Sequence, residues 1–244
     1  MTRTRTSVAV TALAIVAMVA GVAAPIGAAP AAGPDAAGAA AATASVAELQ
    51  QSQSNCSFPQ TFTDASGTEV TIESEPQEIV TLNPSAAQTL WEIGGREKVV
   101  GVSQYATYLD GAENRTIVSG DDGFTNAEVV VDLDPDLVLA PNTIPPETVE
   151  QLRNNGLTVY QFASASSIDA VYDKTERIGA LTGECQGATE TVEWMQTEID
   201  AVRENVSESN RPSVYFEFFE QTTGAETFQH DVITTAGGQN VAAE

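Results

Sequence analysis

Apolar residues between positions 79 and 160 form runs of three or four, separated by stretches with helical spacing. Short apolar runs suit strands covered on both faces, whereas apolar residues three or four apart suit helices with one buried face. The expected strands are Ile79–Leu82, Val99–Val102, Thr116–Val118, Leu137–Ala140 and Leu157–Tyr160. The expected helices are Ser85–Ile93, Ala127–Leu133 and Pro146–Asn154. This alternation predicts an α/β fold with a mostly parallel sheet and helices outside it.

The repeating unit is clearest in the segment Asn126–Ala140. Pro135 has no backbone N–H and restricts the residue before it, so a helix that begins after Asn126 must end before Pro135. The run Leu137–Ala140 is too short for a helix and predicts a buried strand. The segment is therefore one helix–turn–strand unit of the sheet.

Other patterns flank this sheet. Phe62, Val70 and Ile72 surround a turn with Gly67, which predicts a hairpin over residues 58–72. Two helices are expected within residues 166–211, the second over about 187–207 and roughly 30 Å long. A strand at 213–219 and a helix at 231–236 then follow. Since one strand and one helix cannot close a second sheet, we expect a second domain that is incomplete in this chain.

The N-terminus has the pattern of an export signal. Arg3 and Arg5 precede an apolar run, Val8–Ala24, and small residues such as Ala28 follow it. We predict a signal peptide over residues 1–29, with an uncleaved membrane anchor as the alternative. Residues 30–55 are rich in Ala, Gly and Ser and predict a tether. The protein is therefore expected outside the cytoplasm.

Export changes the interpretation of the two cysteines, Cys56 and Cys185. In an oxidising compartment an even pair favours a disulfide, which would close a long loop and contribute about 4–5 kcal/mol. Two unpaired thiols are the alternative. Asn55, Asn114 and Asn205 each begin an N-glycosylation sequon.

The charge is strongly acidic, with 34 Asp and Glu against 10 Lys and Arg and a net charge of −24. Lys98 and Lys174 are the only lysines. Such a surface repels nucleic acid and anionic membranes, so neither is expected as a partner. An acidic, lysine-poor surface is typical of proteins from high-salt environments; ordinary acidic solubility is the alternative.

Residues with catalytic chemistry are scarce. His230 is the only histidine, so a His-rich zinc site is excluded and a Ser-His-Asp triad would depend on that residue. Its polar neighbours favour a position at the start of a helix. The chain contains no dinucleotide or Walker phosphate motif. We therefore expect no catalytic residues, no metal site and no resident cofactor.

Binding is better supported. In open α/β sheets, ligands bind beyond the carboxyl ends of the strands. The residues expected to bind ligand at these ends are Asn83, Pro84, Ser85, Tyr105, Phe124, Pro141 and Asn142. For Tyr105 and Phe124 the alternative is packing against their own loops. Trp91 and Trp194 lie on helix faces and are expected in the core.

Four motifs resemble, in their order and spacing, those of a known family. They are T-D-A-S-G-T-E-V-T-I (63–72), I-V-T-L-N-P-S-A-A-Q-T-L-W-E-I-G (79–94), K-V-V-G-V-S-Q-Y (98–105) and N-A-E-V-V-V-D-L-D-P-D-L-V-L-A (126–140). The family is the helical-backbone substrate-binding proteins of ABC importers for cobalamin and ferric siderophores. The resemblance runs from about Cys56 to the end, and with the acidic surface it suggests a halophilic archaeon as the source.

The resemblance implies two Rossmann-like lobes joined by a long rigid helix, with the ligand between them. The N-terminal lobe would occupy residues 56–165, the interlobe helices 166–211 and the start of the C-terminal lobe 212–244. It also implies that a glutamate on each lobe docks against arginines of the permease. Glu128 matches the first-lobe glutamate, and its counterpart would lie beyond Glu244.

The resemblance indicates the class of the ligand but does not single out one compound. Tyr105 matches a position that contacts corrinoid in cobalamin binders, but Asp122 and Pro141 stand where the cobalamin pattern has tryptophans. The resemblance therefore implies either a corrinoid or a ferric siderophore, with haem also open.

We expect a monomeric solute-binding protein at the extracellular face of the membrane, anchored there if the signal is uncleaved, with an ABC permease as its partner. The alternatives are a secreted, glycosylated surface or adhesion module and an exported hydrolase that uses His230.

Overall fold

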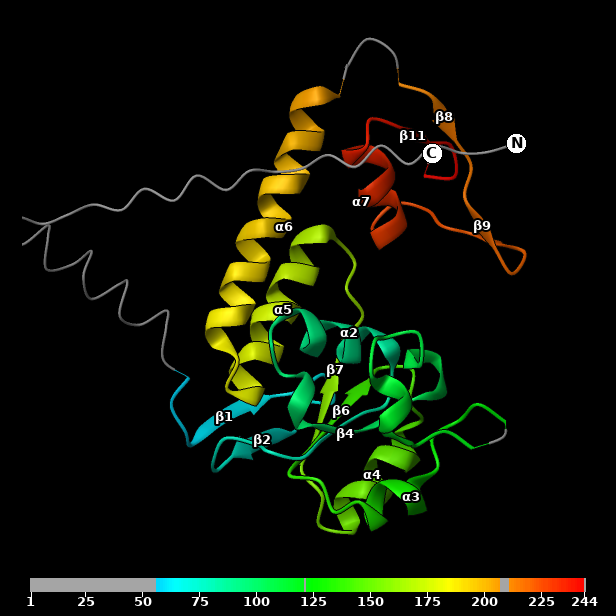
Figure 1. Ribbon diagram of the computed structural model, residues 1–244. Coiled ribbons are helices and arrows are strands. Elements are labelled where there is room, and N and C mark those ends of the chain that lie inside the picture. Colours follow the sequence, from blue (N-terminus) through cyan, green and yellow to red (C-terminus); the bar gives the residue numbers. More distant parts are fainter. Residues whose placement is uncertain (1–55, 121, 207–210, 244) are drawn as a thin grey trace, which may run out of the picture. The chain divides into compact units, whose positions relative to one another are not determined.

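The computed structural model describes residues 56–120, 122–206 and 211–243 (Figure 1). The predicted signal peptide, the tether and the sequon at Asn55 lie outside the described residues. Within the described ranges, no helix is long and apolar enough to cross a membrane.

The central sheet is parallel and confirms the α/β prediction. Its strands stand in the order β5-β4-β3-β6-β7, and every neighbouring pair is parallel. The strands are β3 Ile79–Thr81, β4 Val99–Val102, β5 Thr116–Ile117, β6 Leu137–Pro141 and β7 Val159–Phe162. The unit predicted over Asn126–Ala140 is present as helix α3, Ala127–Asp132, followed by β6.

Helices cover both faces of this sheet, because successive strand residues point to opposite sides. Ile79 packs in a cluster with residues of α2, Pro84–Glu92, α5, Ile168–Thr182, and α6, Cys185–Asn205. Its neighbour Val80 packs in a second cluster with residues of α3 and α4, Pro146–Asn154. Figure 1 shows α3 and α4 together on one side of the sheet and α2 and α5 on the other. Short 3₁₀ turns complete this part at Arg96–Lys98, Gln104–Ala106 and Ala112–Asn114.

A hairpin precedes the sheet, as predicted, with β1 at Gln60–Thr63 paired antiparallel to β2 at Glu69–Ile72. Asp64 organises its turn by accepting backbone hydrogen bonds from Ser66 at 2.8 Å and Thr68 at 3.1 Å. Arg153 of α4 pairs with the same buried carboxylate. Burial alone would raise the pKa of Asp64, but these hydrogen bonds, led by that of the Ser66 hydroxyl, outweigh burial and lower the pKa.

The strand predicted at Leu157–Tyr160 begins later, at Val159, because the end of α4 extends over the preceding residues. Gly156 has a φ of +92°, and the Leu157 N–H donates to Leu152 O at 3.2 Å, which closes the helix. Thr158 O accepts from Val138 N at 2.8 Å, so pairing with β6 starts only there.

A disulfide, an ion pair and a hydrogen bond connect the turn between α5 and α6 to the sheet region. Cys56 and Cys185 form a disulfide, as predicted. Lys98 Nζ lies 2.7 Å from the carboxylates of Glu75 and Glu184 and also donates to Thr182 O. Burial alone would lower the pKa of Lys98, but its two carboxylate partners outweigh that effect and raise the pKa. Gly187 is needed where α6 meets α2, since a Cβ there would lie 1.9 Å from Ile93 O.

After α6, the chain forms short elements. They are β8 Ser213–Val214, β9 Glu217–Phe218, β10 Gln221–Thr222, α7 Phe228–Thr235 and β11 Gln239–Asn240. The prediction of one strand over 213–219 is wrong. Phe219 and Glu220 both have positive φ, so the chain reverses and β9 pairs with β10. The helix expected at 231–236 is present, but starts at Phe228 because Thr227 caps it.

The two tryptophans differ. Trp91 packs partly buried against the core and donates from its indole to Asp110 O at 2.9 Å. Trp194 is 61% exposed, so its assignment to the core is wrong. Helical spacing placed Trp194 beside apolar residues of α6, but among the described residues no element covers it.

Candidate ligand-binding site

A cavity of about 600 Å³ lies beyond the carboxyl ends of three strands. Its lining comes from the segments that follow β3, β6 and β7, from α5 and from the residues around the start of α7. The lining residues are Asn83, Ser85, Thr89, Pro141, Asn142, Thr143, Ala163, Ser164, Ala165, Ser166, Val171, Lys174, Thr175, Glu226, Thr227, Phe228 and Gln229. Hydroxyls, amides and small apolar groups therefore dominate its surface.

The topology of the sheet explains why the cavity lies there. The chain leaves β3 to form β4 on one side and returns to form β6 on the other. The connections after β3 and β6 therefore run apart and leave a crevice at their carboxyl ends. Asn83 follows β3 and Asn142 follows β6, so the two amides border the same crevice.

Asn83 and Ser85 are held at the rim by the start of α2. Asn83 Oδ1 accepts from Ala86 N at 3.3 Å and caps the helix, while Asn83 Nδ2 donates to Ser85 Oγ at 2.7 Å. Pro84 occupies the first turn, where its missing N–H has no cost. The capped turn therefore orients the two polar side chains that line the cavity.

Lys174 supplies a positive charge to the cavity from α5. Its ammonium lies 5.1 Å from the centre of the Phe162 ring, at the last residue of β7. Burial lowers the pKa of Lys174. Thr175 beside it is buried and donates to Val171 O at 2.9 Å within the helix.

Of the predicted ligand-binding residues, the structure brings Asn83, Ser85, Pro141 and Asn142 to this cavity, with Pro84 between the first two. Tyr105 and Phe124 do not line it and are 60% and 69% exposed. The Tyr105 hydroxyl lies against the backbone of Gly123, where an added Cβ would be 2.5 Å away. The ligand contacts of all these residues stay predictions.

Phe124 instead borders a second hollow of about 360 Å³, together with Asp122 and Glu128. Asp122 Oδ1 accepts from Phe124 N at 3.0 Å, so this carboxylate stabilises its own loop. Glu128 lies exposed in the first turn of α3, which Asn126 caps by accepting from Glu128 N and Val129 N. An acidic side chain at a helix start is favoured by the helix dipole.

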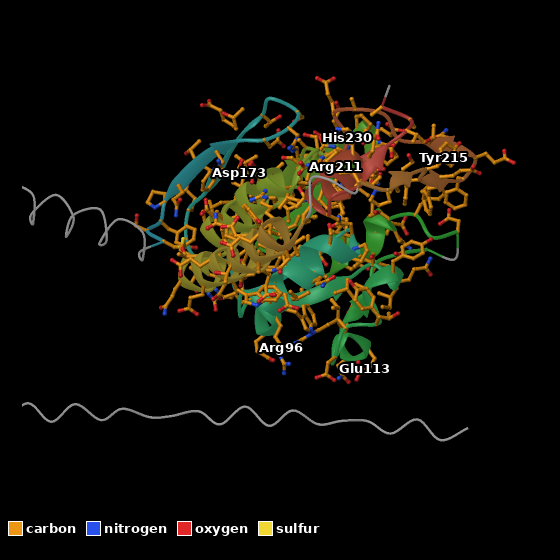
Figure 2. The ribbon with its side chains drawn as sticks, turned by 90° about the horizontal axis from the view of Figure 1, so that it is seen from above. Arg96, Glu113, Asp173, Arg211, Tyr215 and His230 are labelled. Atoms are coloured by element: carbon orange, nitrogen blue, oxygen red, sulfur yellow. A yellow bond between two sulfur atoms is a disulfide. The ribbon has the colours of Figure 1, made fainter. Side chains whose placement is uncertain are left out.

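His230 lies in the first turn of α7, as predicted, where the capping hydroxyl of Thr227 accepts its backbone N–H. Its Nδ1 accepts from Asn240 Nδ2 at 3.4 Å. Figure 2 shows His230 and Tyr215 at the margin opposite Arg96 and Glu113. In the described ranges, no group of three or more His, Cys, Asp or Glu side chains could hold a metal ion. Asn114 and Asn205 are exposed, and their glycosylation stays a prediction.

Sequence reasoning missed the lining from Ala163–Ser166, from α5 and from Glu226–Gln229. Residues 163–166 follow β7. The rule that ligands bind beyond the carboxyl ends of parallel strands would have identified them if the predicted strand had ended at Phe162 instead of Tyr160. Lys174 had a fainter signal, since Val171, Lys174 and Ile178 have the three- and four-residue spacing of one helix face. Nothing in the local sequence pointed to Glu226–Gln229.

A family model described as "Periplasmic binding protein" matches residues 79–244. A cobalamin-binding protein of Halobacterium salinarum is 50% identical over 202 residues, which are 81% of this chain and 55% of that protein. An uncharacterized ABC transporter substrate-binding lipoprotein of Bacillus subtilis, YvrC, is 33% identical over 197 residues, or 77% of this chain and 62% of that protein. The chain thus spans about half the length of the first of these relatives.

Solved structures share the fold. A periplasmic solute-binding protein from Staphylococcus epidermidis, described as possibly iron-binding, aligns with a TM-score of 0.63 at 26% identity and covers 70% of this chain and 69% of its own. The periplasmic heme-binding protein RhuT from Roseiflexus aligns at 0.60 and 28% identity, with 68% and 66% covered. The vitamin B12-binding protein BtuF of Vibrio cholerae aligns at 0.59 and 23% identity.

Proposed function

The chain belongs to the periplasmic binding protein family, and we propose that it is the solute-binding component of an ABC importer for a metal chelate, with a corrinoid as the first candidate. The matched family and the relatives described above are binding proteins, so the chain has no catalytic role. The observation that carries the proposal is the cavity at the carboxyl ends of β3, β6 and β7. Such crevices are the usual ligand sites of open parallel sheets.

The corrinoid is favoured by the 50% identity to a protein named for cobalamin binding. A ferric siderophore or haem stays the alternative, because relatives with the same fold are named for iron or heme. In each case the metal would be part of the cargo. The lining of amides and hydroxyls suits the polar periphery of such a chelate.

The ligand is tested by incubating the exported protein with a corrinoid and, separately, with a ferric siderophore and with haem, followed by gel filtration. We expect visible absorbance of one chelate to coelute with the protein. Ala163→Trp should fill the cavity and weaken retention at least tenfold, whereas Ala201→Trp, the same change on the exposed surface of α6, should not. Retention of none of the three chelates, or equal retention by both variants, would contradict the proposal.

We further propose that Glu128 docks the protein to its permease. The carboxylate is exposed at the start of α3, beside the second hollow, where a permease arginine could reach it. An exposed charge pair of this kind affects the association rate more than the affinity. Association with permease-containing vesicles should slow for Glu128→Arg but not for Glu193→Arg on α6. Equal rates for the two variants would remove Glu128 from the interface.

A further inference from the structure

We propose that Lys174 is the anion-binding residue of the cavity and pairs with a phosphate or carboxylate group of the bound chelate. The inference rests on the ligand-binding role proposed above and deepens it, because it specifies the chemistry of one part of the cargo.

The position of the ammonium supports this assignment. Lys174 lines the cavity from α5, and its Nζ lies 5.1 Å from the centre of the Phe162 ring. Phe162 is 5% exposed and is the last residue of β7, so the ring is fixed by the core. A cation above an aromatic face is held there by the ring's electron density. The charge is therefore placed at the strand end that opens into the cavity.

The absence of a protein counter-ion gives the second argument. The other lysine, Lys98, lies 2.7 Å from both Glu75 and Glu184. In the described part of the chain, by contrast, Lys174 forms no ion pair and no side-chain hydrogen bond. A partly buried ammonium without a partner is unfavourable, and burial accordingly lowers the pKa of Lys174. A bound anion would remove this penalty.

The surroundings suit an oxyanion. Ser164 and Ser166 line the same cavity, and their hydroxyls can donate to phosphate or carboxylate oxygens. Glu226 also lines the cavity, and it forms no ion pair with Lys174 within the described ranges. The charge of Lys174 is therefore available to a ligand, and the nearby hydroxyls would supply additional hydrogen bonds.

The first test needs no chelate. Because the chain has two lysines, selective ¹³C labelling of lysine gives two ε-methylene signals, which Lys174→Gln assigns. Inorganic phosphate should shift the Lys174 signal in a saturable manner and leave the Lys98 signal in place. Lys98 is thus an internal control for general salt effects, which screen exposed charges.

The second test uses two corrinoids that differ in one group, cobinamide and cobinamide phosphate. The protein should bind cobinamide phosphate more tightly by roughly tenfold, which corresponds to one charge-assisted hydrogen bond. Lys174→Gln should bind the two corrinoids equally. Arg203→Gln, which removes the same charge from an exposed pair with Asp200 on α6, should keep the preference.

The outcomes separate the two proposals. A Lys174 signal that phosphate does not move, together with the same corrinoid preference before and after Lys174→Gln, overturns the anion-binding role and leaves corrinoid binding intact. A phosphate-dependent Lys174 shift in a protein that binds neither corrinoid supports the anion-binding role and overturns the corrinoid. A Lys174 signal that phosphate does not move, in a protein that binds neither corrinoid, overturns both proposals.

Discussion

The sheet region, residues 56–165, buries most of its large apolar side chains, whereas the terminal region, residues 211–243, leaves several of them exposed. Ile79, Leu137 and Leu139 of the sheet region are 0% exposed. In the terminal region, Phe218 and Phe219 are 65% and 85% exposed. Among the described residues of the terminal region, those that are buried are Gly237, Gly238 and Asn240.

The difference shows what a strand–helix alternation needs in order to make a core. β3 has a parallel neighbour on each side, and helices cover both of its faces. β8 pairs with β11 over two residues, and β9 with β10 over two residues. Short strands with one neighbour bury little apolar surface, so stability should concentrate in the sheet region.

The largest expected effect comes from the disulfide that ties the sheet region to α6. Replacing both Cys56 and Cys185 by Ser should lower the free energy of unfolding by about 4–5 kcal/mol, because the bridge closes a very long loop in the unfolded chain. Urea unfolding of the two proteins measures the difference. An unchanged midpoint would show that the sheet region does not depend on the bridge.

A matched pair of isoleucines tests the contrast directly. Ile79→Ala should cost about 3 kcal/mol, since it leaves a cavity in a fully buried site of the sheet. Ile233→Ala on the half-buried side of α7 should cost less than about 1 kcal/mol. Both values come from thermal or urea unfolding. Equal losses would mean that the terminal region has a core of comparable quality.

Acid should weaken the sheet region through Asp64. Its pKa is lowered in the folded state, so its contribution is present above the ordinary value of 3.8 and is lost as the pH falls through the folded value. Asp64→Asn should therefore lower the free energy of unfolding by about 2 kcal/mol at neutral pH. This loss is smaller than that from breaking a fully buried ion pair, because Arg153 is partly exposed. It should also flatten the stability curve below pH 3.8, whereas Asp132→Asn at an exposed site should not. If the loss of stability at acidic pH is the same in Asp64→Asn as in the unmodified protein, Asp64 is not its cause.

The smallest effect separates stability from binding. Asn83→Ala and Asn126→Ala each remove a helix cap within the sheet region and should each cost about 1 kcal/mol. Asn83 lines the cavity and Asn126 does not, so chelate retention should fall for Asn83→Ala alone. Equal retention by the two variants would place the ligand elsewhere.

The sequence was sufficient to predict most of the sheet region. Apolar runs bounded by residues such as Pro135 predict the strand positions to within two residues, because residues close to one another in the sequence decide where a strand begins. The error at β7 arose because Leu157 donates its N–H to Leu152 O and so belongs to the end of α4. Trp194 shows a different limit, since spacing identifies residues that share a face but not whether another element covers it.

The candidate site was predicted in part, because the local sequence locates the ends of the strands. Asn142 follows β6 directly and Asn83 lies two residues after β3, so the rule for parallel sheets finds both. Lys174 comes from α5 and Glu226 from the segment before α7, and the spacing of residues along the chain does not show that these elements reach the cavity. Tyr105 and Phe124 follow strands too, but neither lines the cavity: Phe124 borders the second hollow, and the Tyr105 hydroxyl lies against Gly123.

The abrupt end of β6 bears on how such proteins diverge. Ala140 is 0% exposed within the sheet, and Asn142, two residues later, is exposed at the cavity. The core residues of β6 therefore end at Ala140, Pro141 is both buried and at the cavity, and Asn142 begins the exposed lining. If the cavity binds the chelate as proposed, exposed positions such as Asn142, Thr143 and Ala163 can change without repacking the core, whereas Ile144 packs against it. These exposed positions are therefore the ones to vary in changing the proposed ligand specificity.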